Sequence, residues 1–161
     1  MTPDEFAEQY KANLPRIAAF IARRVERNLV EDLCSDVFEI AYRKRDQAPQ
    51  ESDRQFGWLC QIAQNLINNQ RRREVTSKKL VVALSVPTSS PSAESMVVQD
   101  LHLRECWNQL KPKQQQILAM VAFDELSIQE VAMILQIKPN AATVRLSRAR
   151  EAFAKLLESK N

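Results

Sequence analysis

The sequence predicts an all-α protein: two small helical domains joined by a flexible linker, with a helix-turn-helix in the second. A single glycine, Gly57, occurs in 161 residues, which disfavours β-hairpins because their turns need backbone with positive φ. Apolar residues make up 45% of the chain and recur at spacings of three and four, as in amphipathic helices. Residues 86–95 are rich in Ser and Pro, a composition typical of linkers. We therefore expect domains at residues 1–80 and 99–161, with a linker at 81–98.

The first domain opens with a strong helix-start signal. Thr2 is a good N-cap, Pro3 suits the first helical position, and Glu5 completes a capping box. Pro15 lacks a backbone N–H, so we expect it to end this helix and a second helix to occupy residues 14–27. Three basic side chains are expected on the solvent side of that second segment: Arg23, Arg24 and Arg27.

A further helix is expected over residues 31–43, with acids in its first turn, where the helix dipole favours negative charge. Its predicted inward stripe is Leu33, Val37, Ile40 and Ala41. On the other side, Asp32, Asp36 and Glu39 follow one another at spacings of four and three and form an acidic ridge. The ridge is either an ordinary solvated face or a docking edge for a basic or polar partner.

After a polar loop, residues 44–52, a long helix is expected over residues 53–73. Its predicted buried face consists of Phe56, Leu59, Ile62, Ala63, Leu66 and Ile67. The opposite face carries Gln61, Gln64, Asn65, Asn68, Asn69 and Arg72, and no acid occurs from residue 54 to residue 73. Because Asn is a poor helix former, three of them in a helix interior indicate a use. Amides beside arginines suit contact with exposed bases and phosphates; a plain polar helix is the alternative.

Two core helices are expected to begin the second domain. The first would bury Leu101, Leu103, Cys106, Trp107 and Leu110; the second, starting at Pro112, would bury Ile117, Leu118, Met120, Val121 and Phe123. A turn at residues 124–126 then leads into the helix-turn-helix.

The helix-turn-helix is predicted over residues 127–150. Ser127 and Glu130 form a capping box for its first helix. Residues 136–139 are long enough only for a turn, and we expect Asn140 to cap the second helix. Val144 and Ala149 are expected to face inward in that helix, with Leu146 marginal.

The outward face of the second helix is basic and polar. Its members are Thr143, Arg145, Ser147, Arg148 and Arg150, and no acid occurs between Glu130 and Glu151. Arginines neutralise phosphates and form bidentate contacts with guanine, and the second helix of a helix-turn-helix lies in the major groove. The sequence therefore predicts DNA binding, the alternative being a solvated basic helix.

No motif indicates catalysis, a metal or a cofactor, so we expect a non-enzyme. The chain has one histidine, His102, and no glycine-rich phosphate loop. Three separated cysteines lie in apolar patterns, as buried thiols of a reducing compartment do. The longest apolar run, residues 117–123, is too short to span a bilayer, and no signal-peptide pattern is present. We expect a cytoplasmic protein with no membrane insertion.

Three segments resemble a known family in its own order. Residues 30–38, VEDLCSDVF, resemble region two of bacterial sigma factors of the extracytoplasmic-function (ECF) type. Residues 56–65, FGWLCQIAQN, with the arginines at 71–73, resemble the next helix of that region, and residues 110–157 resemble region four. The resemblance covers nearly the whole chain: region two, linker, region four.

This resemblance implies partners and site residues. The expected partners are core RNA polymerase, promoter DNA and an anti-sigma factor. Binding to the polymerase clamp would involve Asp32, Leu33, Asp36, Val37 and Glu39. The loop at residues 44–53 and the following helix would melt and read the minus-ten element, through Trp58, Gln61, Asn65, Asn68, Asn69 and Arg72. The minus-thirty-five element would be read as duplex by Asn140, Thr143, Arg145, Ser147 and Arg148.

The chain departs from the family pattern at several positions. Gln136 and Ala141 stand where members often have glycine, and Gln115 where arginine is frequent. Two other functions are weighed: a self-standing helix-turn-helix regulator, which would leave the amide face and acidic ridge unused, and a protein adaptor, which the acid-free helices disfavour.

Overall fold

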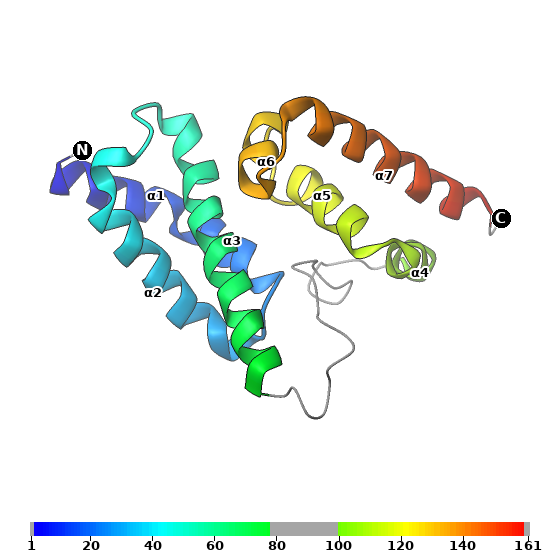
Figure 1. Ribbon diagram of the computed structural model, residues 1–161, viewed down its shortest axis with the longest axis horizontal. Helices are drawn as coiled ribbons and strands as arrows, with labels where there is room; N and C mark the ends of the chain where they lie inside the picture. The colour runs from blue at the N-terminus through cyan, green and yellow to red at the C-terminus, as the bar shows by residue number, and fades with distance from the viewer. Residues whose placement is uncertain (1, 78–99, 160–161) are drawn as a thin grey trace. The chain divides into compact units, whose positions relative to one another are not determined.

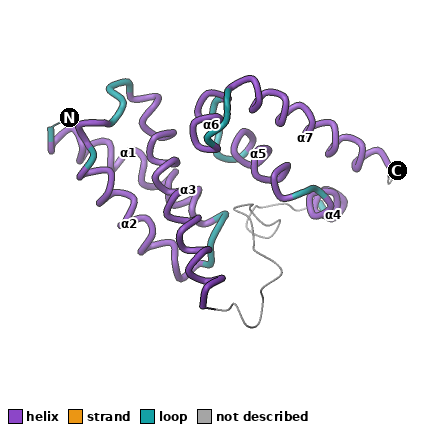
Figure 2. The backbone as a smooth tube through the Cα atoms, viewed as in Figure 1, coloured by secondary structure: helices purple, strands orange, loops and turns teal. Residues whose placement is uncertain are grey.

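The computed structural model describes residues 2–77 and 100–159 (Figure 1). Both ranges are helical, and neither contains a strand (Figure 2). The chain separates into two compact units, Met1–Pro87 and Thr88–Asn161. The predicted all-α fold class with two helical domains is therefore confirmed. The predicted linker, residues 81–98, lies outside the described residues.

Within residues 2–77, the first unit is a bundle of α1 (Pro3–Ala22), α2 (Arg27–Arg43) and α3 (Ser52–Ser77). One turn of 3-10 helix, η1 (Arg45–Gln47), lies between α2 and α3. Each long helix packs against the other two, as Figure 1 shows. Their fully buried apolar side chains are Ile17, Phe20, Ile21, Val37, Ala41, Cys60, Ala63 and Ile67.

Pro15 does not end the first helix, contrary to the sequence-based prediction: α1 continues through it. Before the proline, the Tyr10 ring meets the Phe38 ring of α2 edge-to-face, with centroids 4.4 Å apart. After it, Phe20 and Ile21 are fully buried. A kink or break would separate these contacts, so packing on both sides of the proline outweighs the loss of one backbone hydrogen bond.

Helix α2 begins at Arg27, with Glu26 as its N-cap, rather than at Glu31. Its first turn therefore contains no acidic residue, and the predicted acidic start is wrong. The inward stripe is otherwise confirmed: Leu33, Val37 and Ala41 are buried, while Ile40 is half-buried. The added first turn brings half-buried Leu29 and Val30 into the helix, and Leu29 lies one turn before the buried Leu33 on the same face.

Arg24 is buried, at 4% exposure, where a solvated side chain was predicted. Its Nη1 donates to the carbonyl oxygen of Phe20 at 2.7 Å, and its Cζ lies 3.6 Å from the centroid of that ring. Arg71 of α3 donates from Nη2 to the carbonyl oxygen of Arg24, at 2.6 Å. Burial lowers the pKa of the Arg71 guanidinium from its usual value. Arg71 thus ties the segment that follows α1 to α3 instead of extending the exposed basic surface.

Within residues 100–159, the second unit contains α4 (Leu101–Gln109), α5 (Pro112–Ala122), α6 (Ile128–Leu135) and α7 (Pro139–Ser159). Helix α7 packs against each of the other three. Trp107, Leu110 and Ala119 form a buried cluster, against which Phe153 and Leu156 of α7 pack.

Several residues predicted for this core are exposed instead: Leu101 at 69%, Leu103 at 37% and Phe123 at 37%. The orientation of α4 explains the first two. Its His102 Nε2 lies 3.1 Å from the carbonyl oxygen of Leu157, and the Cys106 sulfur lies 3.9 Å from the same nitrogen. The face of α4 that meets α7 therefore contains His102 and Cys106, which leaves Leu101 and Leu103 on its flanks.

Candidate nucleic-acid interfaces

The predicted helix-turn-helix is present as α6, a short turn and α7. The capping box is confirmed: the Glu130 N–H donates to Ser127 Oγ at 3.2 Å, and the Ser127 N–H donates to Glu130 Oε1 at 2.9 Å. Gln136 ends α6 in the left-handed region, with φ 58° and ψ 45°. A glutamine thus occupies αL, which costs more there than glycine would.

The start of α7 differs from the prediction. The helix begins at Pro139, and the N–H of Ala142 donates to the carbonyl oxygen of Lys138 at 3.0 Å. Asn140 is therefore inside the first turn rather than at the cap. Pro139 occupies the first helical position, where its missing N–H has no intrahelical partner to lose.

The predicted polar face of α7 is accessible. Asn140, Thr143, Ser147 and Arg148 are exposed, and Arg145 is half-buried. The inward position of Ala149 is confirmed, but that of Val144 is wrong: Val144 is 47% exposed, whereas Ala142, Leu146 and Ala149 are buried. Spacings of four and three between these three residues match the helical repeat, and that stripe is the one that meets the other helices.

An open hollow lies along this polar face. It is lined by Lys113, Gln114, Asn140, Ala141, Val144, Arg145 and Arg148. The first turns of α5 and α7 both border it, and the N-termini of helices attract anions. Lys113 and Gln114 were missed because their neighbours in the hollow lie far along the chain. The lysines flanking the helix-start Pro112 were the only available signal.

The amide face of α3 is only partly accessible. Asn65, Asn69 and Arg72 are exposed, while Trp58, Gln61 and Asn68 are half-buried. Gln64 does not belong to this face: it is 3% exposed, and its Nε2 donates to Asn68 Oδ1 at 3.0 Å. This bond between successive turns holds the Asn68 side chain against the helix.

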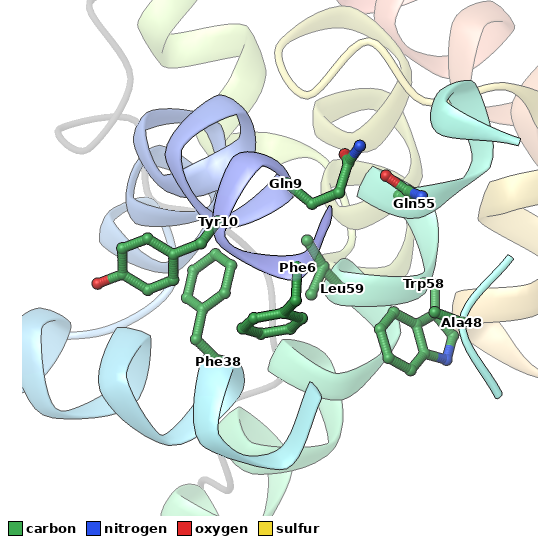
Figure 3. A pocket seen from close by; sticks show the side chains of 8 residues that line it. All are labelled: Phe6, Gln9, Tyr10, Phe38, Ala48, Gln55, Trp58 and Leu59. Carbon is green, nitrogen blue, oxygen red and sulfur yellow. The ribbon is translucent and has the colours of Figure 1, made fainter. Parts of the chain in front are cut away.

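Two neighbouring hollows lie where the loop between α2 and α3 approaches α1. The polar one, of about 750 Å³, is lined by Glu5, Gln9, Arg45, Asp46, Ala48, Pro49, Gln50 and Gln55. The apolar one is narrow, with room for little more than one water molecule, and is lined by Phe6, Gln9, Tyr10, Phe38, Ala48, Gln55, Trp58 and Leu59 (Figure 3). Both therefore share Gln9, Ala48 and Gln55.

Gln55 is a buried amide at the boundary of the two hollows, 5% exposed. Its Nε2 donates to the carbonyl oxygen of Pro49 at 3.2 Å, but its Oε1 has no partner among the described residues. A buried acceptor without a partner is costly, so this atom is suited to a donor from a ligand. Sequence patterns missed Gln55 because it precedes the amide-rich part of α3.

The acidic ridge of α2 is exposed at Asp32, Asp36 and Glu39. Glu39 Oε1 lies 3.9 Å from Arg43 Nη2, an exposed pair one helical turn apart. Leu33 and Val37, predicted to join the ridge in binding a partner, are 4% and 0% exposed. We correct their assignment: both side chains belong to the core and support the ridge from beneath.

Other sites were searched for in the part of the chain that the structure describes. No group of three His, Cys, Asp or Glu side chains in residues 2–77 and 100–159 could hold a metal ion. None of the helices in those ranges is long and apolar enough to cross a membrane. Cys34, Cys60 and Cys106 are buried thiols that form no disulfide, as expected, and burial raises the pKa of the Cys34 thiol.

Comparisons with known proteins cover both units. The family model "Sigma-70 region 2" matches residues 9–76, and "Sigma-70, region 4" matches residues 101–153. The chain is 27% identical over 157 residues to the RNA polymerase sigma factor CarQ of Myxococcus xanthus, covering 96% of this chain and 90% of that protein. It is also 27% identical to the ECF RNA polymerase sigma factor BldN of Streptomyces coelicolor, with 96% of this chain and 61% of that protein covered.

Solved structures share the fold. The sigma factor RpoE from Bartonella quintana, crystallised with the anti-sigma factor NepR, matches with a TM-score of 0.71 at 23% identity, over 98% of this chain and 99% of that one. CnrH, solved with the cytosolic domain of CnrY, matches with a TM-score of 0.63 at 20% identity, over 99% and 92%. Since the two sigma-70 regions follow each other along most of the sequence, the chain belongs to the sigma-70 family and is an RNA polymerase sigma factor of the ECF type, which directs promoter recognition.

Proposed function

We propose that the two units of this sigma factor divide promoter recognition between them. Residues 99–161 would read the minus-thirty-five element as duplex DNA. Residues 1–80 would bind core polymerase and capture the melted minus-ten element, and residues 81–98 would link the two. The observation that carries the proposal is the hollow along α7, which gathers the cations Lys113, Arg145 and Arg148 beside two helix N-termini.

The chemistry of this hollow suits a duplex. Lys113 and the N-termini of α5 and α7 favour phosphates, which fix the register of a protein on DNA. Arg145 and Arg148, one turn apart on α7, carry the planar donor pair that fits guanine O6 and N7. Asn140 offers an amide suited to adenine near the start of the helix, where base edges are read.

The first unit suits unstacked bases. The polar hollow beside the α2–α3 loop is bordered by Gln9, Gln50 and Gln55, and the adjoining apolar hollow by Trp58. The unpartnered Oε1 of Gln55 would accept a hydrogen bond from the exocyclic amino group of a flipped base. Exposed Asn65, Asn69 and Arg72, with half-buried Gln61 and Asn68, would contact the rest of the melted strand.

The acidic ridge of Asp32, Asp36 and Glu39 would dock on the polymerase clamp. These three carboxylates are exposed on one helix, and complementary charge steers association and fixes the orientation of partners. The free protein has few cations in either interface, and each phosphate contact contributes about one unit of salt slope. We therefore expect promoter recognition to require core polymerase.

Regulation and location complete the proposal. An anti-sigma factor would control this chain, as NepR and CnrY are partners of the structurally similar sigma factors. The protein would act in the cytoplasm, without catalysis of its own and without a cofactor. A self-standing regulator is not favoured, since both sigma-70 regions match.

In vitro transcription with bacterial core polymerase tests this function. A genomic fragment library serves as template, with and without the protein, and transcript starts are sequenced. Starts that need the protein and share two spaced upstream elements are the expected result. If the protein alone shifts specific duplex DNA and yields no new starts, the self-standing regulator replaces the sigma-factor assignment. If neither occurs, no DNA role is left, and the protein acts through another protein.

A further inference from the structure

Val144 is an exposed, branched apolar side chain on an otherwise polar face. It is 47% exposed, although Ala142 and Leu146 on either side of it in the sequence are buried. It lines the hollow along α7 together with Ala141, Arg145 and Arg148. About half of this valine stays exposed, and its side chain offers no hydrogen bond, so what it can add to binding is an apolar contact.

The position of Val144 on α7 indicates which apolar group it would contact. Val144 lies in the second turn of α7, which begins at Pro139, and base edges are read by the N-terminal part of a recognition helix. In the major groove, thymine alone presents a methyl group, and small apolar side chains contact it. Valine has a restricted χ1, so its two methyl groups are held in a fixed position.

We propose that Val144, with Ala141 one turn before it, recognises a thymine of the minus-thirty-five element through its 5-methyl group. The proposal rests on the proposed role of α7 in reading duplex DNA. It adds an apolar specificity determinant beside the guanidinium groups of Arg145 and Arg148 and the amide of Asn140 in the same hollow.

The neighbouring side chains define the surroundings of this thymine. Arg145 follows Val144 directly and Arg148 lies one turn beyond it, so bases beside the thymine face guanidinium groups that pair with guanine. Thr143 Oγ1 donates to the carbonyl oxygen of Pro139 at 3.1 Å. That hydroxyl proton is therefore engaged within the helix, whereas the side chains of Val144 and Ala141 offer apolar groups alone.

Replacing thymine by deoxyuridine tests the contact because it removes only the methyl group. Each thymine of the minus-thirty-five element in a mapped promoter is replaced singly, on either strand. Binding of the full-length protein with core polymerase is measured by fluorescence anisotropy. We expect one position at which wild-type binding falls about fourfold, the equivalent of one buried methyl group. Val144→Ala should bind the thymine promoter about as weakly and lose its sensitivity to deoxyuridine at that position.

Matched controls isolate the effect. Deoxyuridine in the spacer between the two elements should not change binding. Leu101→Ala removes another exposed apolar side chain of the same unit and should keep the wild-type sensitivity. Circular dichroism confirms that Val144→Ala is folded, which is expected because alanine favours helix over valine.

Two results would overturn the proposal: wild-type binding that is insensitive to deoxyuridine at every position, or Val144→Ala that retains full sensitivity. An element without thymine would overturn it too. Arg145→Ala and Arg148→Ala separate this failure from failure of the proposed function. If both variants recognise the element normally, α7 is not its reader; if they lose recognition while deoxyuridine has no effect, only the role of Val144 is wrong.

Discussion

The polar surfaces of α3 and α7 differ in how they hold their side chains. On α7 the arginines line a hollow together with Lys113 of α5, and the apolar side chains in the same lining, Ala141 and Val144, are small. On α3 the amides are partly buried, and Gln64 and Asn68 bond to each other. A cationic surface backed by helix N-termini attracts phosphate at a distance. An amide surface provides short-range hydrogen bonds whose donors and acceptors are already positioned.

This difference indicates why one chain carries both surfaces. Duplex DNA presents its phosphates outside, so a reader of duplex needs charge first and base contacts second. Melted DNA exposes its bases, so stacking and amide contacts supply more of the binding. The two units therefore have surfaces suited to two states of the same promoter.

The largest expected effect is loss of stability in core variants. Its distribution along the chain tests whether the two surfaces belong to independently folding units. Phe20 is fully buried in the first unit, and Phe20→Ala should reduce its stability by about 3–5 kcal/mol. Hydrogen exchange measured by mass spectrometry should then show lost protection in residues 52–77 and unchanged protection in residues 139–159. Met120→Ala, in the core of the second unit, should give the reverse pattern. Equal loss in both regions would mean that the units fold together.

The next effect concerns the cationic surface. Arg145→Ala and Arg148→Ala should each weaken recognition of the minus-thirty-five element by about 1–3 kcal/mol, if the lost contact is bidentate to a base. Transcription from promoters with mutated elements measures the loss and assigns it to one element. Lys155→Ala removes an exposed cation of the same helix outside the hollow and should leave selectivity unchanged. Normal selectivity in both arginine variants would contradict the role of α7.

A smaller effect is expected on the amide surface. Asn65→Ala and Asn69→Ala should each reduce open-complex formation by about 0.5–1.5 kcal/mol, the usual net value of one hydrogen bond. Permanganate footprinting of melted thymines measures the open complex. Because alanine favours helix more than asparagine does, a loss cannot arise from a weakened α3. Asn28→Ala, at an exposed position in the first turn of α2, is the control. If this variant reduces open-complex formation as much, the α3 amides have no special role.

The smallest effect is expected at the acidic ridge. Asp32→Asn or Asp36→Asn should weaken core-polymerase binding roughly two- to fivefold, since exposed ion pairs contribute little individually. Glu39→Gln should have less effect, because Glu39 already lies near Arg43. Fluorescence anisotropy titrations at two salt concentrations should show that the affinity difference between wild-type protein and variant becomes smaller as the salt concentration rises. A difference that is independent of salt would argue against a charge contact.

Local signals in the sequence determined which segments are helical and where α1 and α6 begin. The capping boxes at Thr2 and Ser127 form as predicted, because each involves residues only three apart. The left-handed turn at Gln136 follows from the short connection between two strongly amphipathic helices. The apolar repeats also identified most of the core, and the resemblance to the sigma-70 family gave the function.

Only the tertiary structure decided which of several possible faces each helix buries. The local pattern favoured Val144 over Leu146 as a core residue, but contact with α4, α5 and α6 selects the stripe that contains Leu146. Arg24 and Gln64 are polar residues that packing covers, and Pro15 remains helical because both sides of it are anchored. Lys113 of α5 and Arg145 of α7 line the same hollow, although they are far apart in the sequence. Periodicity fixes spacing along one helix, whereas burial depends on neighbours that the local pattern does not contain.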